Sequence, residues 1–349
     1  MPINFTLADF SNGLLLATLI LYALAMLGYA CDFAFARHRV VAGVTEAEEA
    51  RTTAPALVGV GASGPAAPVK SERTPADGAG AADVSGEVPP ASRWPFGFWQ
   101  RLAFGLTCIG LVLHVAAILT RGLAEHRVPW GNMYEFIGAF TCMAVLVLVA
   151  SSVWYRAYYM GLFVLLPVVL ALGIDLTWIY TPVGSLVPAL QSYWIAIHVT
   201  AMIVAIGLFI FGAVVTTLYL LTERSQRRLG AGQSSWSAGI WEHLPVPAIL
   251  DRLSYRAVLF GFPVWTFGVM AGAIWADHAW GRYWGWDPKE TWSFITWVVY
   301  AMFLHARATA GWRGRRAAWI QLAGFACLMF NVIGVNLWIT GLHSYAGMS

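Results

Sequence analysis

Residues 192–221 read SYWIAIHVTAMIVAIGLFIFGAVVTTLYLL and contain no Asp, Glu, Lys or Arg. A helix of about 20 mostly apolar residues crosses the hydrocarbon core of a bilayer. This stretch therefore predicts a membrane-spanning helix that is long enough to project beyond the bilayer. Its apolar residues do not alternate with a period of two, which is the pattern of the strands in a membrane β-barrel. The stretch therefore indicates a helical membrane protein.

Seven further stretches have the same character. The eight predicted spans are Gly13–Phe35, Gln100–Thr120, Met133–Tyr155, Tyr158–Asp175, Ser192–Leu221, Val258–Ala276, Trp292–Arg307 and Ala317–Thr340. The composition agrees, because 59% of the residues are hydrophobic and 11% are charged, against about 45–50% and 25% in soluble domains. A net charge of +3 gives no reason to expect a nucleic-acid partner. We expect an all-α polytopic membrane protein with about eight transmembrane helices.

The basic residues predict the orientation of the chain, because cytoplasmic loops of membrane proteins are enriched in Lys and Arg. No basic residue precedes the first predicted span, whereas Arg37 and Arg39 follow it. The N-terminus is therefore expected outside the cytoplasm, without a cleaved signal peptide. If the spans alternate from there, all of the 21 Lys and Arg residues fall in or beside cytoplasmic segments except Arg121, Arg127, Arg282 and Lys289. Both termini are then expected outside.

Residues 38–93 differ in composition from the rest of the chain. From Val40 to Arg93 there is no aromatic residue, and Ala, Gly, Pro, Ser and Glu dominate. Such a segment cannot bury enough apolar surface to fold, so residues 38–93 are expected to form a disordered cytoplasmic linker. The expected organisation is an appended transmembrane helix at residues 1–37, this linker, and a functional membrane core at residues 94–349.

An unusual aromatic segment lies outside the membrane between the sixth and seventh predicted spans. Residues 277–293 read DHAWGRYWGWDPKETWS. Trp and Tyr are commonly enriched at membrane interfaces, and such a belt is one explanation. A belt needs no fixed spacing, however, and the interleaved glycines permit close approach of the backbone. The segment therefore favours a platform for a flat apolar ligand.

The spacing of this segment resembles a known signature. Trp280-Gly281-x-x-Trp284-x-Trp286-Asp287-x-x-Glu290 matches the tryptophan-rich WWD signature of the haem-handling proteins of c-type cytochrome maturation. Within that superfamily the core is similar to the CcsA (ResC) family, a membrane subunit of the System II haem lyase. The segment PWGNMYE at residues 129–135 is also similar to that family. The resemblance extends from about residue 94 to the end and leaves out the linker.

Two histidines are candidate haem ligands near the outer face. His198 lies near the outer end of the fifth predicted span, and His343 follows the eighth. A neutral imidazole binds iron through one nitrogen when the other is hydrogen-bonded, although a single such histidine is usually a packed core residue. His126 and His278 are also expected outside and remain rivals. The resemblance to the CcsA family implies that His198 and His343 ligate haem b held by Trp280, Trp284 and Trp286.

A third histidine, His305, is expected at a different depth. It follows Trp292 by 13 residues, which is roughly 20 Å along a helix, and a histidine within the membrane is a candidate functional residue. The resemblance implies that His305 is an intramembrane haem ligand whose second ligand comes from a CcsB (ResB) partner subunit. His114 is expected in the outer half of the second span, where a packed structural role competes with a haem role.

The acidic residues are expected to be structural. Asp287 and Glu290 stand beside the Trp residues of the signature and could contact haem propionates through Arg282 or Lys289. Because carboxylates repel propionates, a role in holding the loop is favoured. Asp175 and Glu135 are expected at outer helix ends within reach of water. Four cysteines stand singly in apolar runs and do not form a redox pair, so any thioredoxin-like thiol reductant must be another protein.

These features together predict haem delivery and presentation to the CxxCH motif of apocytochrome c, as a lyase that is active only with its partner subunit. One alternative is a membrane b-type cytochrome, which usually pairs haem ligands at two depths. A second is a transporter with inverted repeats, and no such repeat is evident. A third is a CcmC-like haem-delivery protein, which is shorter. The bacterial plasma membrane is the expected location, with the thylakoid membrane as the alternative.

Overall fold

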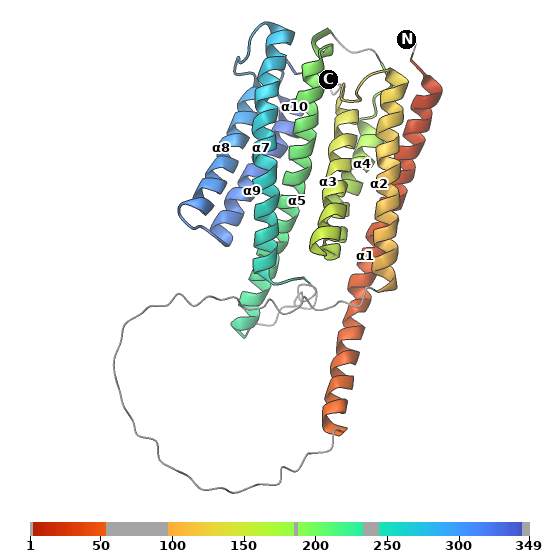
Figure 1. The fold of residues 1–349 in the computed structure, drawn as a ribbon, viewed down its shortest axis with the longest axis vertical. Coiled ribbons are helices and arrows are strands. Elements are labelled where there is room, and N and C mark those ends of the chain that lie inside the picture. The colour runs from red at the N-terminus through yellow and green to blue at the C-terminus, as the bar shows by residue number, and fades with distance from the viewer. Residues whose placement is uncertain (1–2, 54–96, 185–187, 233–243, 344–349) are drawn as a thin grey trace, which may run out of the picture. The chain divides into compact units, whose positions relative to one another are not determined.

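The structure is a computed structural model that describes residues 3–53, 97–184, 188–232 and 244–343, with residues 35–53 described by their backbone only. Every regular element in these ranges is a helix. The chain divides into two units, one made of residues 1–34 and 98–349 and the other of residues 35–97. Figure 1 shows the long helices of the first unit running side by side as a bundle. The predicted all-α polytopic fold is confirmed.

Seven helical segments in the described ranges combine the length and apolar composition needed to cross a membrane. They are Phe5–Ala34 of helix α1 (Phe5–Thr53), α2 (Phe98–Glu125), α3 (Met133–Tyr155), a short 3-10 turn with α4 (Tyr158–Trp178), α5 (Tyr193–Gly230), α7 (Pro247–Trp280), and Arg315–Trp338, which contains α9 and α10. Each overlaps one of the predicted spans. The orientation of the termini stays a prediction.

The predicted seventh span corresponds to helix α8 (Pro288–Ala308). Its 21 residues extend about 30 Å, which is enough to cross the hydrocarbon core. Its composition is too polar for it to be counted with the seven apolar segments, because charged residues stand near both of its ends. α8 packs mainly against α9 and more weakly against α7.

Local sequence signals explain where several helices begin and end at one end of the bundle. Asn132 and Ser192 cap the starts of α3 and α5 by accepting hydrogen bonds from backbone amides of the first turn. Asp287 and Glu290 form a capping box at the start of α8. Gly281 ends α7 in the left-handed conformation, with φ of 70°, which glycine adopts without steric cost. The loops before α3 and α5 and the loop between α7 and α8 lie at one end of the bundle.

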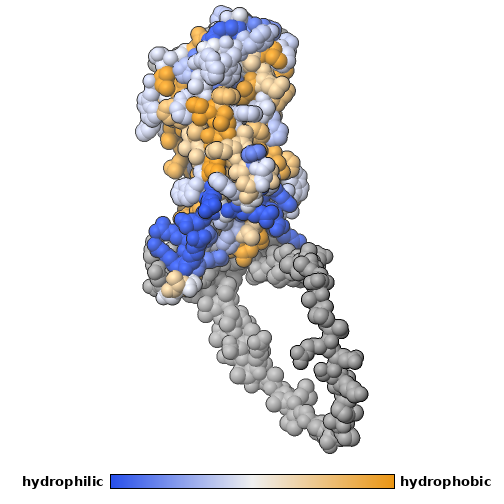
Figure 2. All heavy atoms as spheres, turned by 90° about the vertical axis from the view of Figure 1, so that its left-hand side faces the viewer, coloured by the Kyte–Doolittle hydropathy of each residue, from blue (hydrophilic) through white to orange (hydrophobic). Residues whose placement is uncertain are grey.

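The surface and the packing agree with a lipid environment. Figure 2 shows apolar side chains gathered in a band around the middle of the helices, with hydrophilic residues beyond both edges. Large exposed apolar side chains on different helices include Leu119, Leu170, Phe260 and Leu337. The most extensive contact between two described helices joins α5 and α7. The start of α5 and the end of α7 therefore hold the adjoining loops at that end of the bundle.

One helix extends beyond its predicted end, and another contains a turn that is not α-helical. Helix α1 continues to Thr53, into the segment expected to be a linker, because residues 44–50 (VTEAEEA) are rich in helix-favouring Glu and Ala. The rest of that segment, residues 54–93, lies outside the described residues. The last span contains a π-helical turn at Phe330–Gly334, a deviation that often occurs at functional sites.

Candidate functional site

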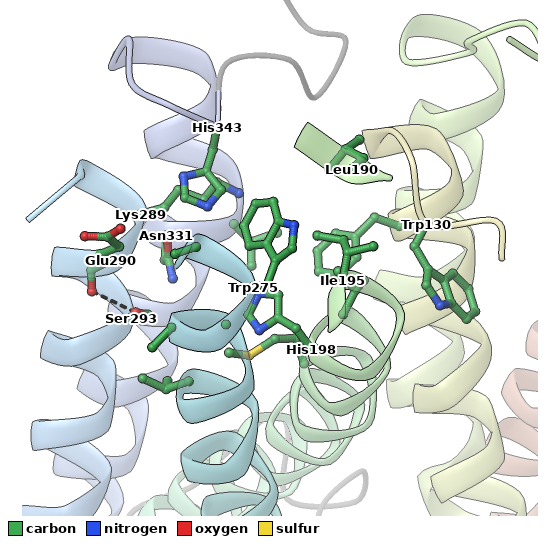
Figure 3. A pocket seen from close by; sticks show the side chains of 18 of the residues that line it. Trp130, Leu190, Ile195, His198, Trp275, Lys289, Glu290, Ser293, Asn331 and His343 are labelled. Atoms are coloured by element: carbon green, nitrogen blue, oxygen red, sulfur yellow. Dashed lines mark hydrogen bonds between the residues drawn. The ribbon is translucent and has the colours of Figure 1, made fainter. Parts of the chain in front are cut away.

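A cavity opens at one end of the bundle, among α5, α7, α8 and the last span (Figure 3). Its walls surround about 1100 Å³ of space, a volume that includes open solvent. Most of its lining is apolar, and its aromatic members are Trp130, Phe136, Trp265, Trp275, Trp280, Tyr283 and Trp284. The cavity therefore suits a large, flat, apolar ligand.

His198 and His343, which are 145 positions apart in the sequence, both line this cavity. His198 lies on the second turn of α5, and its Nδ1 donates a hydrogen bond of 2.7 Å to the carbonyl oxygen of Gly268 on α7. That bond fixes the tautomer in which Nε2 carries the lone pair. Gly272 allows the ring to approach α7, because a Cβ there would lie 2.7 Å from the imidazole. The backbone of α7 therefore sets the orientation of His198.

Asp287 orients His343. The Nδ1 of His343 donates a hydrogen bond of 2.8 Å to Oδ2 of Asp287, and the Leu342 amide donates one of 2.7 Å to Oδ1. A carboxylate behind the histidine fixes its tautomer, again with the lone pair on Nε2, and raises its basicity as a metal ligand. Asp287 thereby joins the end of the described chain to the start of α8.

The pKa values of this pair favour a carboxylate and a neutral imidazole. Burial alone would raise the pKa of Asp287, but the hydrogen bonds from His343 and Leu342 hold it below its usual range. Burial lowers the pKa of His343 even though the hydrogen bond to Asp287 opposes the shift. The neutral imidazole is the form that binds a metal ion, so His343 is ready for that role near neutral pH.

The residues of the tryptophan signature divide into those that line the cavity and those that shape the loop. Trp280 and Trp284 line it. Trp286 does not: its side chain is 65% exposed and packs edge-on against Trp284 and Phe294. Its φ of 59° turns the chain at this point, and that turn was not readable from the sequence. The structure therefore places Trp286 outside the wall of the cavity, whereas the sequence predicted that it holds the ligand together with Trp280 and Trp284.

Glu290 holds the loop together, as expected. Its Oε2 accepts hydrogen bonds from the amides of Gly285 at 2.8 Å and Asp287 at 3.1 Å. Arg282 folds its guanidinium over Gly285, where any Cβ would collide with it, and lies 4.0 Å from Glu290. These contacts fix the loop from residue 281 to residue 287 in one conformation. Glu290 also lines the cavity, whereas Asp287 stands behind His343.

Trp275 is a site residue that the sequence reading missed. It is 2% exposed and lies on α7, with its indole 6.0 Å from the His198 ring in a parallel arrangement and 5.7 Å from the His343 ring. Trp280 packs edge-on against it at 4.8 Å. A ligand that both histidines bind would therefore also contact Trp275. A tryptophan inside an apolar span reads as ordinary core, and only its spacing of five residues before the signature was available as a signal.

Lys289 contributes the positive charge of the cavity. Among the described residues that line it, Lys289 is the one Lys or Arg side chain. Burial lowers its pKa to about 8. Figure 3 shows Lys289 beside His343 on the side of the cavity formed by α8. An ammonium group in largely apolar surroundings favours the approach of an anion.

A buried ion network supports the loop before α3 and corrects one expectation. Glu135 is 5% exposed, and its carboxylate accepts hydrogen bonds from Arg121, Arg127 and the amide of Gly131. Asp175 is also fully buried. The expectation that water reaches these two acids is wrong, because both are buried, and Arg121 and Arg127 cover Glu135. Glu135 thereby positions the loop at residues 130–132, which lines the cavity.

The other four histidines whose side chains the structure describes lie away from the cavity. His126 and His278 are exposed and are not among its lining residues, and His278 donates to the Ile274 carbonyl of its own helix. His114 is fully buried, with its Nδ1 3.4 Å from the hydroxyl of Tyr22, which favours its packed, structural role. His305 is exposed near the end of α8, where a second protein could reach it.

Comparisons with known proteins agree with these features. The family model described as cytochrome C assembly protein matches residues 130–343. The chain is 33% identical over 298 residues to the cytochrome c biogenesis protein CcsA of Gloeobacter violaceus, covering 72% of this chain and 88% of the relative. It is 33% identical over 264 residues to the CcsA protein of Guillardia theta, covering 71% and 86%. It is 35% identical over 255 residues to that of Mesostigma viride, covering 66% and 82%. The matched range begins at Trp130 and ends at His343, so it contains the whole described cavity.

Proposed function

The chain belongs to the CcsA family of cytochrome c biogenesis proteins, and from this premise we propose that it is the haem-handling subunit of a System II haem lyase. In this proposal the outer cavity receives haem b and presents it to the CxxCH motif of an apocytochrome c. Membership of a cytochrome c assembly family itself implies that haem is involved.

The observation that carries this proposal is the pair of histidines in one aromatic cavity. His343 ends the matched range and His198 lies 145 positions before it, and each has its Nδ1 hydrogen-bonded to a fixed acceptor. Two such imidazoles are suited to the two axial positions of haem iron. The residues present therefore fit a haem with two histidine ligands, and the aromatic lining fits its flat ring.

The protein's contribution is to bind, orient and shield its cargo. The haem vinyl groups supply the bond-forming chemistry, since each cysteine S–H of the CxxCH motif adds across one vinyl double bond. Trp275, Trp280 and Trp284 supply flat apolar surfaces, and Asp287 keeps His343 in the required tautomer. The covalent step needs cysteines from the apocytochrome, kept reduced by a thioredoxin-like protein. Enzymatic activity is therefore assigned only to the complex with its partner.

His305 supplies a second site in this proposal. Its exposed position near the end of α8 suits a haem held jointly with a CcsB (ResB) partner subunit. Haem would enter at His305 and reach the outer cavity afterwards. With both termini outside, the cavity would face the compartment in which c-type cytochromes mature. We place the protein in the bacterial plasma membrane, with the thylakoid membrane as the alternative.

The proposal is tested with the complex of this chain and its partner, purified without added haem. It predicts an absorption spectrum of low-spin haem with two histidine ligands. Replacing His343 with Ala should weaken that spectrum, and added imidazole should restore it by occupying the vacated position. A wild-type complex that contains no haem would contradict the proposal.

A further inference from the structure

The cavity has two chemically different sides. Figure 3 shows Lys289, Glu290 and Asn331 on one side, and Leu190 and Ile195 on the opposite side. The first side is formed by the start of α8 and the π-helical turn of the last span, and the second by the start of α5 and the loop before it. A ligand with one charged edge and one apolar edge would therefore fit in one orientation only.

Lys289 is available to an anion. In the described part of the chain its ammonium forms no ion pair within 4.0 Å. Of the two acids beside it in the sequence, Asp287 accepts hydrogen bonds from His343, Leu342 and the Lys289 backbone. Glu290 accepts two backbone amides through Oε2, which also lies near Arg282, whereas its Oε1 has no hydrogen-bond partner. A cation held in an apolar cavity gains most from a carboxylate that arrives with the ligand.

Haem has the matching chemistry. Its two propionate groups lie together on one edge of the porphyrin ring, and its vinyl groups lie toward the other. We propose that Lys289 pairs with a haem propionate and so turns the vinyl edge toward the apolar side formed by Leu190 and Ile195. This inference rests on the proposed function, and it assigns Lys289 as the positioning residue that decides which edge of the haem is offered to the cysteine thiols.

The test compares two probes on the full-length protein prepared from a haem-deficient host. One probe is iron protoporphyrin IX, and the other is its dimethyl ester, in which both carboxylates are blocked. Wild type should bind the free acid on the order of ten-fold more tightly than the ester, as a charge-assisted hydrogen bond in a buried site implies. Lys289→Met should lose that preference by binding the acid more weakly while binding the ester as before.

Two further variants separate recognition from structure. Lys289→Arg keeps the positive charge and should retain most of the preference for the acid. Arg228→Met removes an equal charge from an exposed position on α5 outside the lining, and it should bind both probes as wild type does. The propionate bending band in resonance Raman spectra provides a readout that does not depend on affinity: it should shift in Lys289→Met and stay unchanged in Arg228→Met.

Two results would overturn the assignment. Wild type could bind the acid and the ester equally, or Lys289→Met could weaken both by the same factor without a change in the propionate band. The first result needs no variant, so the inference stays testable even if Lys289→Met fails to fold. Failure of the proposed function would look different, because neither probe would then give a low-spin, two-histidine spectrum in wild type.

Discussion

Replacing Asp287 with Asn tests how much the hydrogen bond between Asp287 and His343 contributes to haem binding. The carboxylate of Asp287 accepts from the Leu342 amide through one oxygen and from His343 through the other. Asn has a single acceptor oxygen, so if it keeps the Leu342 bond its NH₂ group faces the N–H of His343, donor against donor. In that orientation the NH₂ group also faces the Lys289 amide, whose hydrogen bond Oδ2 accepts in the wild type, so the first turn of α8 loses one capping bond as well. Glu290 still accepts the amides of Gly285 and Asp287, so the change should act mainly on the orientation of His343.

The size of the effect follows from that one bond. A hydrogen bond to a charged group contributes about 1.5–3 kcal/mol, and loss of a partner behind a metal-binding histidine typically lowers metal affinity about 10–100-fold. We expect haem affinity to fall within that range in Asp287→Asn. Part of the bound haem should become high-spin, because His343 no longer holds the iron while His198 still does. Added imidazole should restore the low-spin form.

The assay is a haem titration of the full-length protein from a haem-deficient host, followed by its Soret band. Asp277→Asn is the matched control, because Asp277 lies close to the same loop on α7 and is not among the residues that line the cavity. It should bind haem as wild type does. The reasoning is refuted if Asp287→Asn keeps wild-type affinity and spin state, or if Asp277→Asn loses as much.

Three other predictions concern separate parts of the structure. Trp280→Ala should lower haem affinity and Trp286→Ala should not, because, of these two residues, Trp280 lines the cavity and Trp286 does not. An equal loss of haem affinity in both variants, measured by haem titration, would contradict this. Glu135→Ala leaves Arg121 and Arg127 with Glu125 as their remaining carboxylate partner and should destabilise the fold by about 1–3 kcal/mol, the cost of unsatisfied buried donors; an unchanged unfolding midpoint in detergent would show that Glu135 is not stabilising. His305→Ala should lower the haem content of the complex with its partner, and unaltered haem stoichiometry would remove His305 from the route.

Much of the fold could be predicted because one physical requirement governs it. Apolar runs such as Met133–Tyr155 must be helical in a bilayer, and the structure begins and ends α3 at these same two residues. The common location of His198 and His343 was also predictable, since His198 lies near the start of the fifth predicted span and His343 follows the eighth, on the same predicted side. Whether α8 spans the membrane was harder to predict, because polar residues stand at both of its ends. Those at its start adjoin the loop at residues 281–287, and those at its end lie toward the opposite end of the helix bundle.

The details that the sequence could not supply depend on contacts between distant segments. The burial of Glu135 depends on Arg121 and Arg127, which reach it from the preceding segment. The outward direction of Trp286 depends on a positive φ in a loop that Glu290 holds in place. The position of Trp275 beside both histidines depends on which face of α7 meets α5. None of these relations leaves a periodic pattern in the sequence.

The central claim is that His198 and His343 hold haem together in the outer cavity. The most direct measurement is a cryo-electron microscopy structure of the haem-loaded complex with its partner subunit. The account predicts density for a porphyrin between the tryptophan loop and α5, with the iron bound by Nε2 of His198 and Nε2 of His343. Iron bound by His126 or His278, or a cavity without haem in a complex that carries haem elsewhere, would contradict it.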